Sequence, residues 1–182
     1  MSEEKPEIKE DSKEVDKDPK EKDDFLENAD EIEPQLWLGS EDAGHCSLSL
    51  LQKHNIKSVV VAGFGITMSH PKDITYHRLK CIDLPVYDIT NDIISTIRFI
   101  ERQKASQNKD HSVLVHCARG KSRSVTIVIG YIMWKHRMSF ENAYHFVKQK
   151  RKIISINAGF EKQLKEFEKI KERSLFIPLI KP

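Results

Sequence analysis

The stretch VLVHCARGKSRS, residues 113–124, decides the fold that we expect for this chain. Its first three residues are all apolar, as in a parallel strand that is buried on both faces of a sheet. Residues 125–133, which follow it, are apolar on nearly every side of a helix and indicate a buried central helix. Between them, Gly120 can adopt a backbone conformation that a side chain would penalise. The stretch therefore predicts a strand, a tight loop and a helix in direct succession.

Working outward, apolar runs of strand and helix length alternate along the chain. We expect strands at 36–38, 59–61 and 76–82 and helices at 41–54, 89–105, 139–150 and 158–173. Asp88, Ser139 and Asn157 stand just before three of these helices and are natural N-caps. This alternation predicts an α/β domain over residues 32–173, with a central, mostly parallel twisted sheet of four or five strands flanked by helices.

Charge divides the chain into two unlike parts. Residues 1–33 hold 15 Asp and Glu against 6 Lys, whereas residues 34–182 hold 24 Lys and Arg against 13 Asp and Glu. With so few apolar residues, segment 1–31 is expected to be a disordered acidic leader, either solubilising or folding back on the basic body. A basic body suits anionic partners. The apolar tail, 174–182, is expected to pack on the domain or to bind a partner.

The cysteines and the termini bear on the compartment. Cys46, Cys81 and Cys117 are odd in number and widely spaced, which argues against a disulfide framework or a zinc site. A reducing compartment, cytoplasmic or nuclear, is therefore expected. We expect no secretory signal and no transmembrane segment, since no apolar run approaches the ~18 residues that a spanning helix needs. Ser2 stands where N-myristoylation requires glycine.

The loop at 116–124 has the composition of an anion site. A tight turn between strand and helix directs the backbone N–H groups of residues 118–123 inward, and the helix adds the positive end of its dipole. Arg123 can donate two parallel hydrogen bonds to a phosphate. The same field should make Cys117 a thiolate, hence a nucleophile. An ordinary buried cysteine is the alternative, but it would not explain Gly at +3 and Arg at +6.

These residues resemble the dual-specificity branch of the protein tyrosine phosphatase superfamily, whose signature is His-Cys-x5-Arg followed by Ser or Thr. The resemblance covers roughly 32–172. Beyond the loop, the stretches 36–43, 122–133 and 157–164 carry it. It is nearest to the small, single-domain, atypical members. It implies a monomeric enzyme without metal or cofactor that forms a cysteinyl-phosphate on Cys117. The residues implied to bind phosphate are Ala118, Arg119, Gly120, Lys121, Ser122 and Arg123, with Ser124 assisting the leaving sulfur and His116 orienting the loop.

A general acid must protonate the leaving oxygen, and two aspartates compete for this role. In the family pattern the acid ends a strand and precedes, by five residues, an Asn or Asp that starts a helix. Asp83 fits as the acid and Asp88 as the cap, while the reverse assignment remains open. Cys81, two residues before Asp83, is either an ordinary buried cysteine or a partner for a reversible disulfide with Cys117.

The substrate class is less well determined than the reaction. The resemblance implies phosphotyrosine and phosphoserine or phosphothreonine in proteins, a MAP kinase among them, and no nucleic acid. Arg119 and Lys121 add two cations to the loop, which could instead favour phosphoinositides or inositol phosphates. Alternatively, both side chains point into solvent and act only through long-range attraction.

Overall fold

Five strands form one mixed sheet in the order β1-β2-β5-β3-β4 in the computed structural model, which describes residues 23–105 and 111–169. β1 and β2 pair antiparallel, and the other neighbours pair parallel, as the alternation of strands and helices predicted. The strands are β1 Ala29–Glu33, β2 Leu36–Gly39, β3 Ile56–Ala62, β4 Thr75–Leu79 and β5 Ser112–His116.

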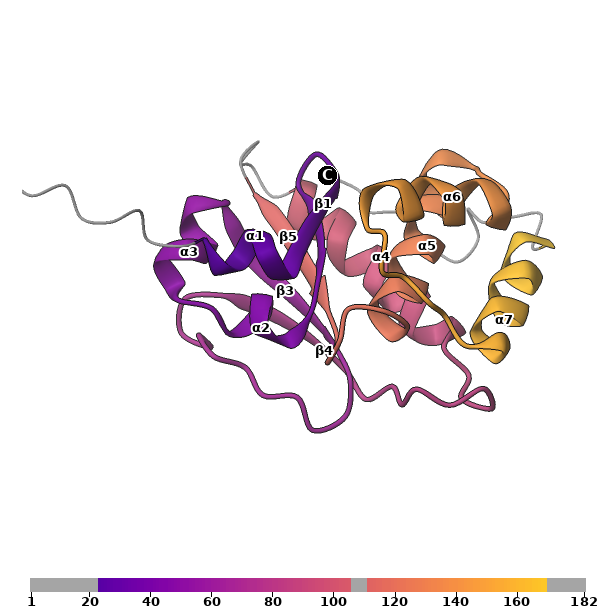
Figure 1. Cartoon of the computed structure of the whole chain (residues 1–182), viewed down its shortest axis with the longest axis horizontal. Coiled ribbons are helices and arrows are strands. Elements are labelled where there is room, and N and C mark those ends of the chain that lie inside the picture. Colours follow the sequence, from indigo (N-terminus) through magenta and orange to yellow (C-terminus); the bar gives the residue numbers. More distant parts are fainter. Residues whose placement is uncertain (1–22, 106–110, 170–182) are drawn as a thin grey trace, which may run out of the picture.

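Helices cover both faces of the sheet (Figure 1). One side carries α1 Asp24–Asn28, α2 Glu41–His45 and α3 Leu48–Lys53. The other side carries α4 Thr90–Ala105, α5 Arg123–His136, α6 Phe140–Lys150 and α7 Ala158–Lys169. Within the described residues, no helix combines the length and the apolar composition needed to cross a bilayer.

Each central strand contributes to two separate cores, because successive side chains point to opposite faces. In β3, Val60 and Ala62 join the core beneath α4–α7, whereas Val59 and Val61 join the core beneath α1–α3. Helix α5 is buried along ten successive residues, 124–133, as its apolar composition predicted. The loop that carries Cys117 thus connects two deeply buried elements, β5 and α5.

Three expected elements differ in extent. The strand expected at 59–61 is longer, since β3 runs from Ile56 to Ala62. The helix expected at 41–54 is two helices, because Cys46 and Ser47 have extended backbone. The Ser47 hydroxyl accepts a hydrogen bond from Leu50 N–H at 3.4 Å and starts α3, a capping role that local periodicity did not indicate. The strand expected at 76–82 ends at Leu79, where pairing with β3 stops.

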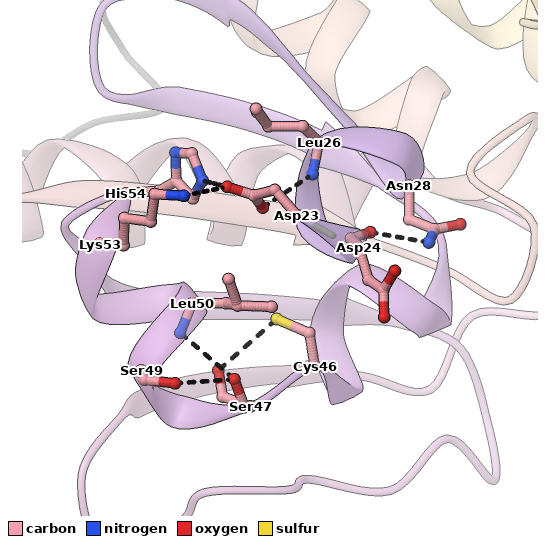
Figure 2. A network of polar contacts seen from close by, with 10 residues as sticks. All are labelled: Asp23, Asp24, Leu26, Asn28, Cys46, Ser47, Ser49, Leu50, Lys53 and His54. Atoms are coloured by element: carbon pink, nitrogen blue, oxygen red, sulfur yellow. Dashed lines mark hydrogen bonds and ion pairs between the residues drawn. The ribbon is translucent and has the colours of Figure 1, made fainter. Parts of the chain in front are cut away.

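Part of the leader that was expected to be disordered to residue 31 has regular structure, because residues 24–31 lie in α1 and in the first part of β1. Phe25 of α1 is fully buried, with its ring 4.7 Å from that of His54 and 5.1 Å from that of Trp37. Asp23 accepts hydrogen bonds from Lys53 at 2.7 Å and His54 at 3.1 Å, which ties the start of α1 to the end of α3 (Figure 2). The expectation failed because it rested on the composition of the whole segment, in which the one large aromatic residue, Phe25, has little weight. The rest of the leader, 1–22, and the tail, 174–182, lie outside the described residues.

Candidate active site

A pocket of about 480 Å³ opens at the carboxyl end of β5, where the loop before α5 meets residues from two other loops. Seven of its eight lining residues belong to the predicted site, six from the loop together with Asp83, and Ser155 is the eighth. The lining residues are Asp83, Cys117, Ala118, Arg119, Lys121, Ser122, Arg123 and Ser155. The remaining predicted residues, His116, Gly120 and Ser124, are buried behind this lining.

The loop carbonyls are held outward by the surrounding scaffold. Ala118 C=O accepts from the N–H of Glu41 at 3.2 Å, and Lys121 C=O accepts from the N–H of Ser155 at 2.8 Å. Gly120 C=O accepts from Nε of Arg151 at 2.9 Å. Because a peptide's C=O and N–H point in opposite directions, these three bonds turn the following N–H groups toward the pocket, as an anion nest requires.

Gly120 is required by its backbone and its surroundings. Its φ is +61°, and an added Cβ would lie 2.6 Å from the carbonyl oxygen of Gly39. Arg151, which bonds to Gly120, is itself buried and forms an ion pair with Asp30 of β1 at 2.5 Å. Strand β1 therefore supports the loop through Asp30 and Arg151.

Ser122 occupies the N-cap position of α5 but does not cap the helix with its side chain. Its hydroxyl donates instead to Oδ1 of Asp83 at 2.7 Å. The first N–H groups of α5 are thus not taken up by the usual capping hydroxyl and remain available to an anion. The same hydrogen bond places Asp83 at the edge of the pocket.

The sulfur of Cys117 lies at the base of the pocket, with only 2% of the residue exposed. Burial opposes its ionisation and is the largest single influence on its pKa. The Ser124 hydroxyl, 3.1 Å from the sulfur, the N–H groups of Ser124 and Gly120, and the charge of Arg123 together outweigh that cost. The net result is a lowered pKa for Cys117, so that the thiolate persists at lower pH than in an ordinary cysteine.

Arg123 also lines this pocket, with its side chain 16% exposed. Its Nε is buried and has no hydrogen-bond partner among the described residues, while Oδ2 of Asp83 lies 3.9 Å away. A Cβ at Gly63 would lie 2.5 Å from one terminal nitrogen of Arg123, so glycine there leaves room for the guanidinium. A buried donor without a protein partner is suited to bonding an oxygen of a bound anion.

His116 packs behind the loop, away from the pocket lining. A Cβ at Gly44 of α2 would lie 2.5 Å from its Nε2, so the ring lies directly against that helix. Burial lowers the pKa of His116 to about 4, with a further contribution from nearby His45. The ring is therefore neutral at neutral pH. Its buried Nδ1 has no hydrogen-bond partner among the described residues, so the orienting role of His116 stays a prediction.

The two candidate acids have different surroundings. Oδ1 of Asp83 accepts from Ser122 and from Nδ2 of Asn157 at 2.8 Å, and its side chain is 40% exposed. Asp88 instead accepts from the N–H of Thr90 at 3.0 Å, at the start of α4. Only Asp83 of these two lines the pocket.

Three residues of the site were missed or given other roles by sequence reasoning. Asn157 was expected only as the cap of α7, and it does accept from Phe160 N–H at 2.9 Å, but it also bonds Asp83. Arg151 and Ser155 support the loop from the segment between α6 and α7. In the sequence, the only sign of this support was the basic residue Arg151. Its charge alone does not show that the side chain is buried.

Cys81 is fully buried, and burial raises the pKa of its thiol to about 12. All three cysteines are free thiols. The raised pKa makes Cys81 a poor nucleophile in this conformation, as expected of an ordinary buried cysteine.

Comparison with known proteins agrees with this geometry. The sequence profile of the dual specificity phosphatase catalytic domain (DSPc) matches residues 36–170. Dual specificity protein phosphatase 19 of Mus musculus is 37% identical over 141 residues, which are 78% of this chain and 62% of the mouse protein. Dual specificity protein phosphatase 1 of Arabidopsis thaliana is 37% identical over 138 residues, 76% of this chain and 68% of the plant protein. The chain thus spans less than two thirds of the mouse relative.

Solved structures give the same result. The human tyrosine phosphatase-like serine/threonine/tyrosine-interacting protein superposes with a TM-score of 0.71 at 34% identity, over 77% of this chain and 95% of that one. A mouse putative dual specificity phosphatase gives 0.75 at 22% identity, over 91% and 99%, which bears on the fold alone. The chain belongs to the dual-specificity phosphatase family, whose catalytic domain is a cysteine-dependent phosphoric monoester hydrolase.

Proposed function

We propose that this chain hydrolyses phosphotyrosine and phosphoserine or phosphothreonine in proteins, with Cys117 as nucleophile, Asp83 as general acid and base, and Arg123 and the loop N–H groups holding the phosphate. The observation that carries the proposal is the placement of Cys117 and Asp83 in one pocket. The sulfur lies at its base with a lowered pKa, and the carboxyl group lies at its edge.

In the first step, the Cys117 thiolate attacks phosphorus, an S–P bond forms and the P–O bond to the substrate breaks. The proton of Asp83 goes to the leaving oxygen, so that the product departs as an alcohol or phenol. Negative charge on the three equatorial oxygens is met by Arg123 and by the N–H groups at the start of α5. Since Ser122 and Asn157 both donate to Oδ1 of Asp83, Oδ2 is the oxygen that carries the proton.

In the second step, the Asp83 carboxylate takes a proton from a water molecule that attacks the phosphocysteine. The S–P bond breaks, inorganic phosphate forms and the sulfur leaves as a thiolate. The Ser124 hydroxyl, 3.1 Å from that sulfur, stabilises the charge that develops there. Asp83 ends the cycle protonated and ready for the next substrate.

Protein substrates are favoured by the relatives. One of them, a Dictyostelium discoideum protein 37% identical over 139 residues, is named MAP kinase phosphatase with leucine-rich repeats protein 3. A phosphorylated MAP kinase is therefore among the substrates we propose. We further propose that the chain acts as a monomer in the cytoplasm or nucleus, where its three free thiols would stay reduced.

Inositol phosphates are the second candidate, because Arg119 and Lys121 both line the pocket. Two more cations near the phosphate would add attraction for a second and third phosphate group. This reading predicts that the variant Arg119→Ala with Lys121→Ala loses activity on inositol polyphosphates far more than on phosphopeptides.

The first test is hydrolysis of a small aryl phosphate by wild type and Cys117→Ser. We expect the variant to lose at least about 10³-fold in kcat, since it removes the nucleophile. Phosphopeptides and inositol phosphates are then compared by kcat/KM. A preference above about tenfold, or about 1.4 kcal/mol, for the inositol compounds would exclude the protein substrate. No hydrolysis by the wild type of any of these compounds would exclude catalysis altogether.

A further inference from the structure

Exposed apolar residues are concentrated in the loops that line or adjoin the candidate pocket. In the described part of the chain, six large hydrophobic residues are well exposed, and five of them lie in the loops beside the pocket. Phe64 and Val86 are the most exposed, at 74% and 90%. We call these five the apolar rim: Phe64, Ile82, Leu84, Val86 and Ile153. Single exposed apolar residues are ordinary, but their concentration at one place marks a contact surface.

One part of the rim surrounds the general acid. Ile82 and Leu84 are the chain neighbours of Asp83, and Val86 lies in the same loop. Phe64 joins them from the loop after β3, because its N–H donates to the carbonyl of Cys81 at 3.2 Å. Gly63, the residue before Phe64, contacts the guanidinium of Arg123. This part of the rim therefore lies next to both Asp83 and Arg123.

Ile153 forms the rest of the rim, in the segment between α6 and α7. Arg151 in this segment bonds the carbonyl of Gly120, and Ser155 bonds that of Lys121 while lining the pocket itself. Ile153 stands between these two tethers, 49% exposed. Apolar groups are thus held near the catalytic loop from two separate segments of the chain.

Helix α7 holds the loop that carries Asp83, residues 80–89, in place, which keeps the apolar side chains of this loop exposed. Gln163 of α7 accepts from the N–H of Ile89 at 2.9 Å and donates to the carbonyl of Tyr87 at 2.8 Å. An added Cβ at Gly159 would lie 1.9 Å from the carbonyl oxygen of Pro85, so the loop lies directly on the start of α7. Fixed, exposed apolar groups lose little conformational entropy when a ligand covers them.

We propose that the apolar rim binds apolar side chains that flank the phosphorylated residue of a protein substrate. The proposal rests on the proposed function, because it takes the phosphate to be held at Cys117. Since Cys117 is only 2% exposed, a phosphorylated side chain must reach down from the mouth of the pocket, which leaves its main chain and neighbouring side chains at the level of the rim. Apolar neighbours would cover the rim and remove apolar surface from water.

A lipid surface is the competing occupant, and charge disfavours it. Val86, the most exposed rim residue, has the exposed Asp88 two residues after it. Anionic headgroups around an inserted Val86 would meet this carboxylate and be repelled. A peptide with neutral apolar residues beside its phosphoresidue meets no such repulsion, because its only anion is the phosphate itself.

The test uses two phosphotyrosine peptides of equal net charge that differ only at the residues flanking the phosphotyrosine, Leu and Phe in one and Ser and Gln in the other. The measured quantity is the ratio of their kcat/KM values within one protein, which cancels any change in the chemical step. We expect a ratio of about ten or more for the wild type, as burial of one or two apolar side chains gives. The double variant Phe64→Ser with Val86→Ser should bring it near one.

Leu26→Ser is the matched control. Leu26 is the sixth exposed hydrophobic residue, at 51%, but it lies on α1. This variant should keep the wild-type ratio, and thermal unfolding of both variants checks that they are folded. A wild-type ratio near one, or an equal loss of preference in Leu26→Ser, would overturn the proposal.

Two further arms separate the alternatives. Phosphatidylcholine vesicles that contain a phosphatidylinositol monophosphate test the lipid surface; faster turnover on them than on the apolar peptide, lost in the Phe64→Ser, Val86→Ser variant, would assign the rim to membranes and overturn the peptide proposal. A small aryl phosphate tests the catalytic site. If the wild type hydrolyses it and the peptide ratio is near one, only the rim proposal fails; if the wild type hydrolyses nothing, the proposed function fails and the rim proposal with it.

Discussion

Asn157 bonds Asp83 with one end of its amide and caps helix α7 with the other. Its Nδ2 donates to Oδ1 of Asp83 at 2.8 Å, and its Oδ1 accepts from the N–H of Phe160 at 2.9 Å. A serine or aspartate could supply the acceptor for the cap, but an aspartate has no donor for Asp83. The amide thus couples the position of the proposed acid to the start of a helix.

The variant Asn157→Asp should therefore keep the helix cap and impair the acid. We expect kcat/KM to fall by about tenfold on an alkyl phosphate, because a like charge beside Asp83 disturbs both its position and its proton affinity. An aryl phosphate with a good leaving group needs little protonation and should be much less affected. Steady-state kinetics on the two substrates measures the difference. An equal loss on both would assign Asn157 a purely structural role.

Exchanging the two candidate acids one at a time tests their assignment. Asp83→Asn removes the proton donor and should lower kcat on a poor leaving group by about 10²-fold or more, while phosphate-analogue binding is kept. Asp88→Asn should change little, since an asparagine oxygen can still accept from Thr90 N–H as Asp88 does. If Asp88→Asn showed the loss and Asp83→Asn did not, the two roles would be reversed.

Alkylation by iodoacetamide measures the state of Cys117. Because its pKa is lowered, the reaction should persist below the pH at which an ordinary thiol stops reacting. Burial raises the pKa of Cys46 to about 11 and that of Cys81 to about 12, so neither should react appreciably near neutral pH. In Ser124→Ala the midpoint should move to higher pH, since the hydrogen bond that favours the thiolate is lost. An unchanged midpoint would contradict the role of Ser124.

Removing Arg151 should weaken both the fold and the loop. Arg151→Met leaves Gly120 C=O without its donor and Asp30 without its ion pair, which we expect to lower the free energy of unfolding by about 2 kcal/mol. The activity on an aryl phosphate should fall as well. Lys152→Met, at the exposed neighbouring position, is the control and should leave both nearly unchanged. Equal effects of the two substitutions in urea unfolding would show that the buried bonds of Arg151 are not the cause.

Acid should destabilise the protein through His116. Its folded pKa is about 4, below the usual 6.5, so between these values the unfolded chain binds a proton that the folded chain does not. Stability is therefore intact above pH 6.5 and falls as the pH decreases toward 4, by roughly 1.4 kcal/mol per pH unit at most. Burial lowers the pKa of His77 and His111 too, which adds to the slope.

The variant His116→Gln isolates this contribution, because His77 and His111 remain. It should be less stable than the wild type at pH 7, where packing is lost, yet lose less stability between pH 6.5 and 4.5. Urea unfolding at a series of pH values gives both slopes. Equal slopes would mean that His116 does not take up a proton on unfolding in this range.

The predictions for the candidate site rest on signals that are local along the chain. Strand, loop and helix follow each other directly at 113–133, so the apolar pattern, Gly120 and the Cys117-to-Arg123 spacing sufficed to predict an anion-binding loop with a nucleophile. Asp83 was reached by the family pattern, with Asp88 left open. The strand order and the break of the 41–54 helix were not predicted, because both depend on contacts between distant segments.

By itself, then, the sequence determined the α/β alternation, the buried strand β5, the helix α5 and the residues that the connecting loop can offer to a phosphate. Only the tertiary structure decided what surrounds that loop. It folds residues 23–31 onto the domain, brings Asp30 and Arg151 behind Gly120, and sets Asn157 against Asp83 across 74 residues of chain. Periodicity and spacing report on neighbours along the chain, whereas a hydrogen bond between distant residues forms only when the packing of whole elements brings its two ends together.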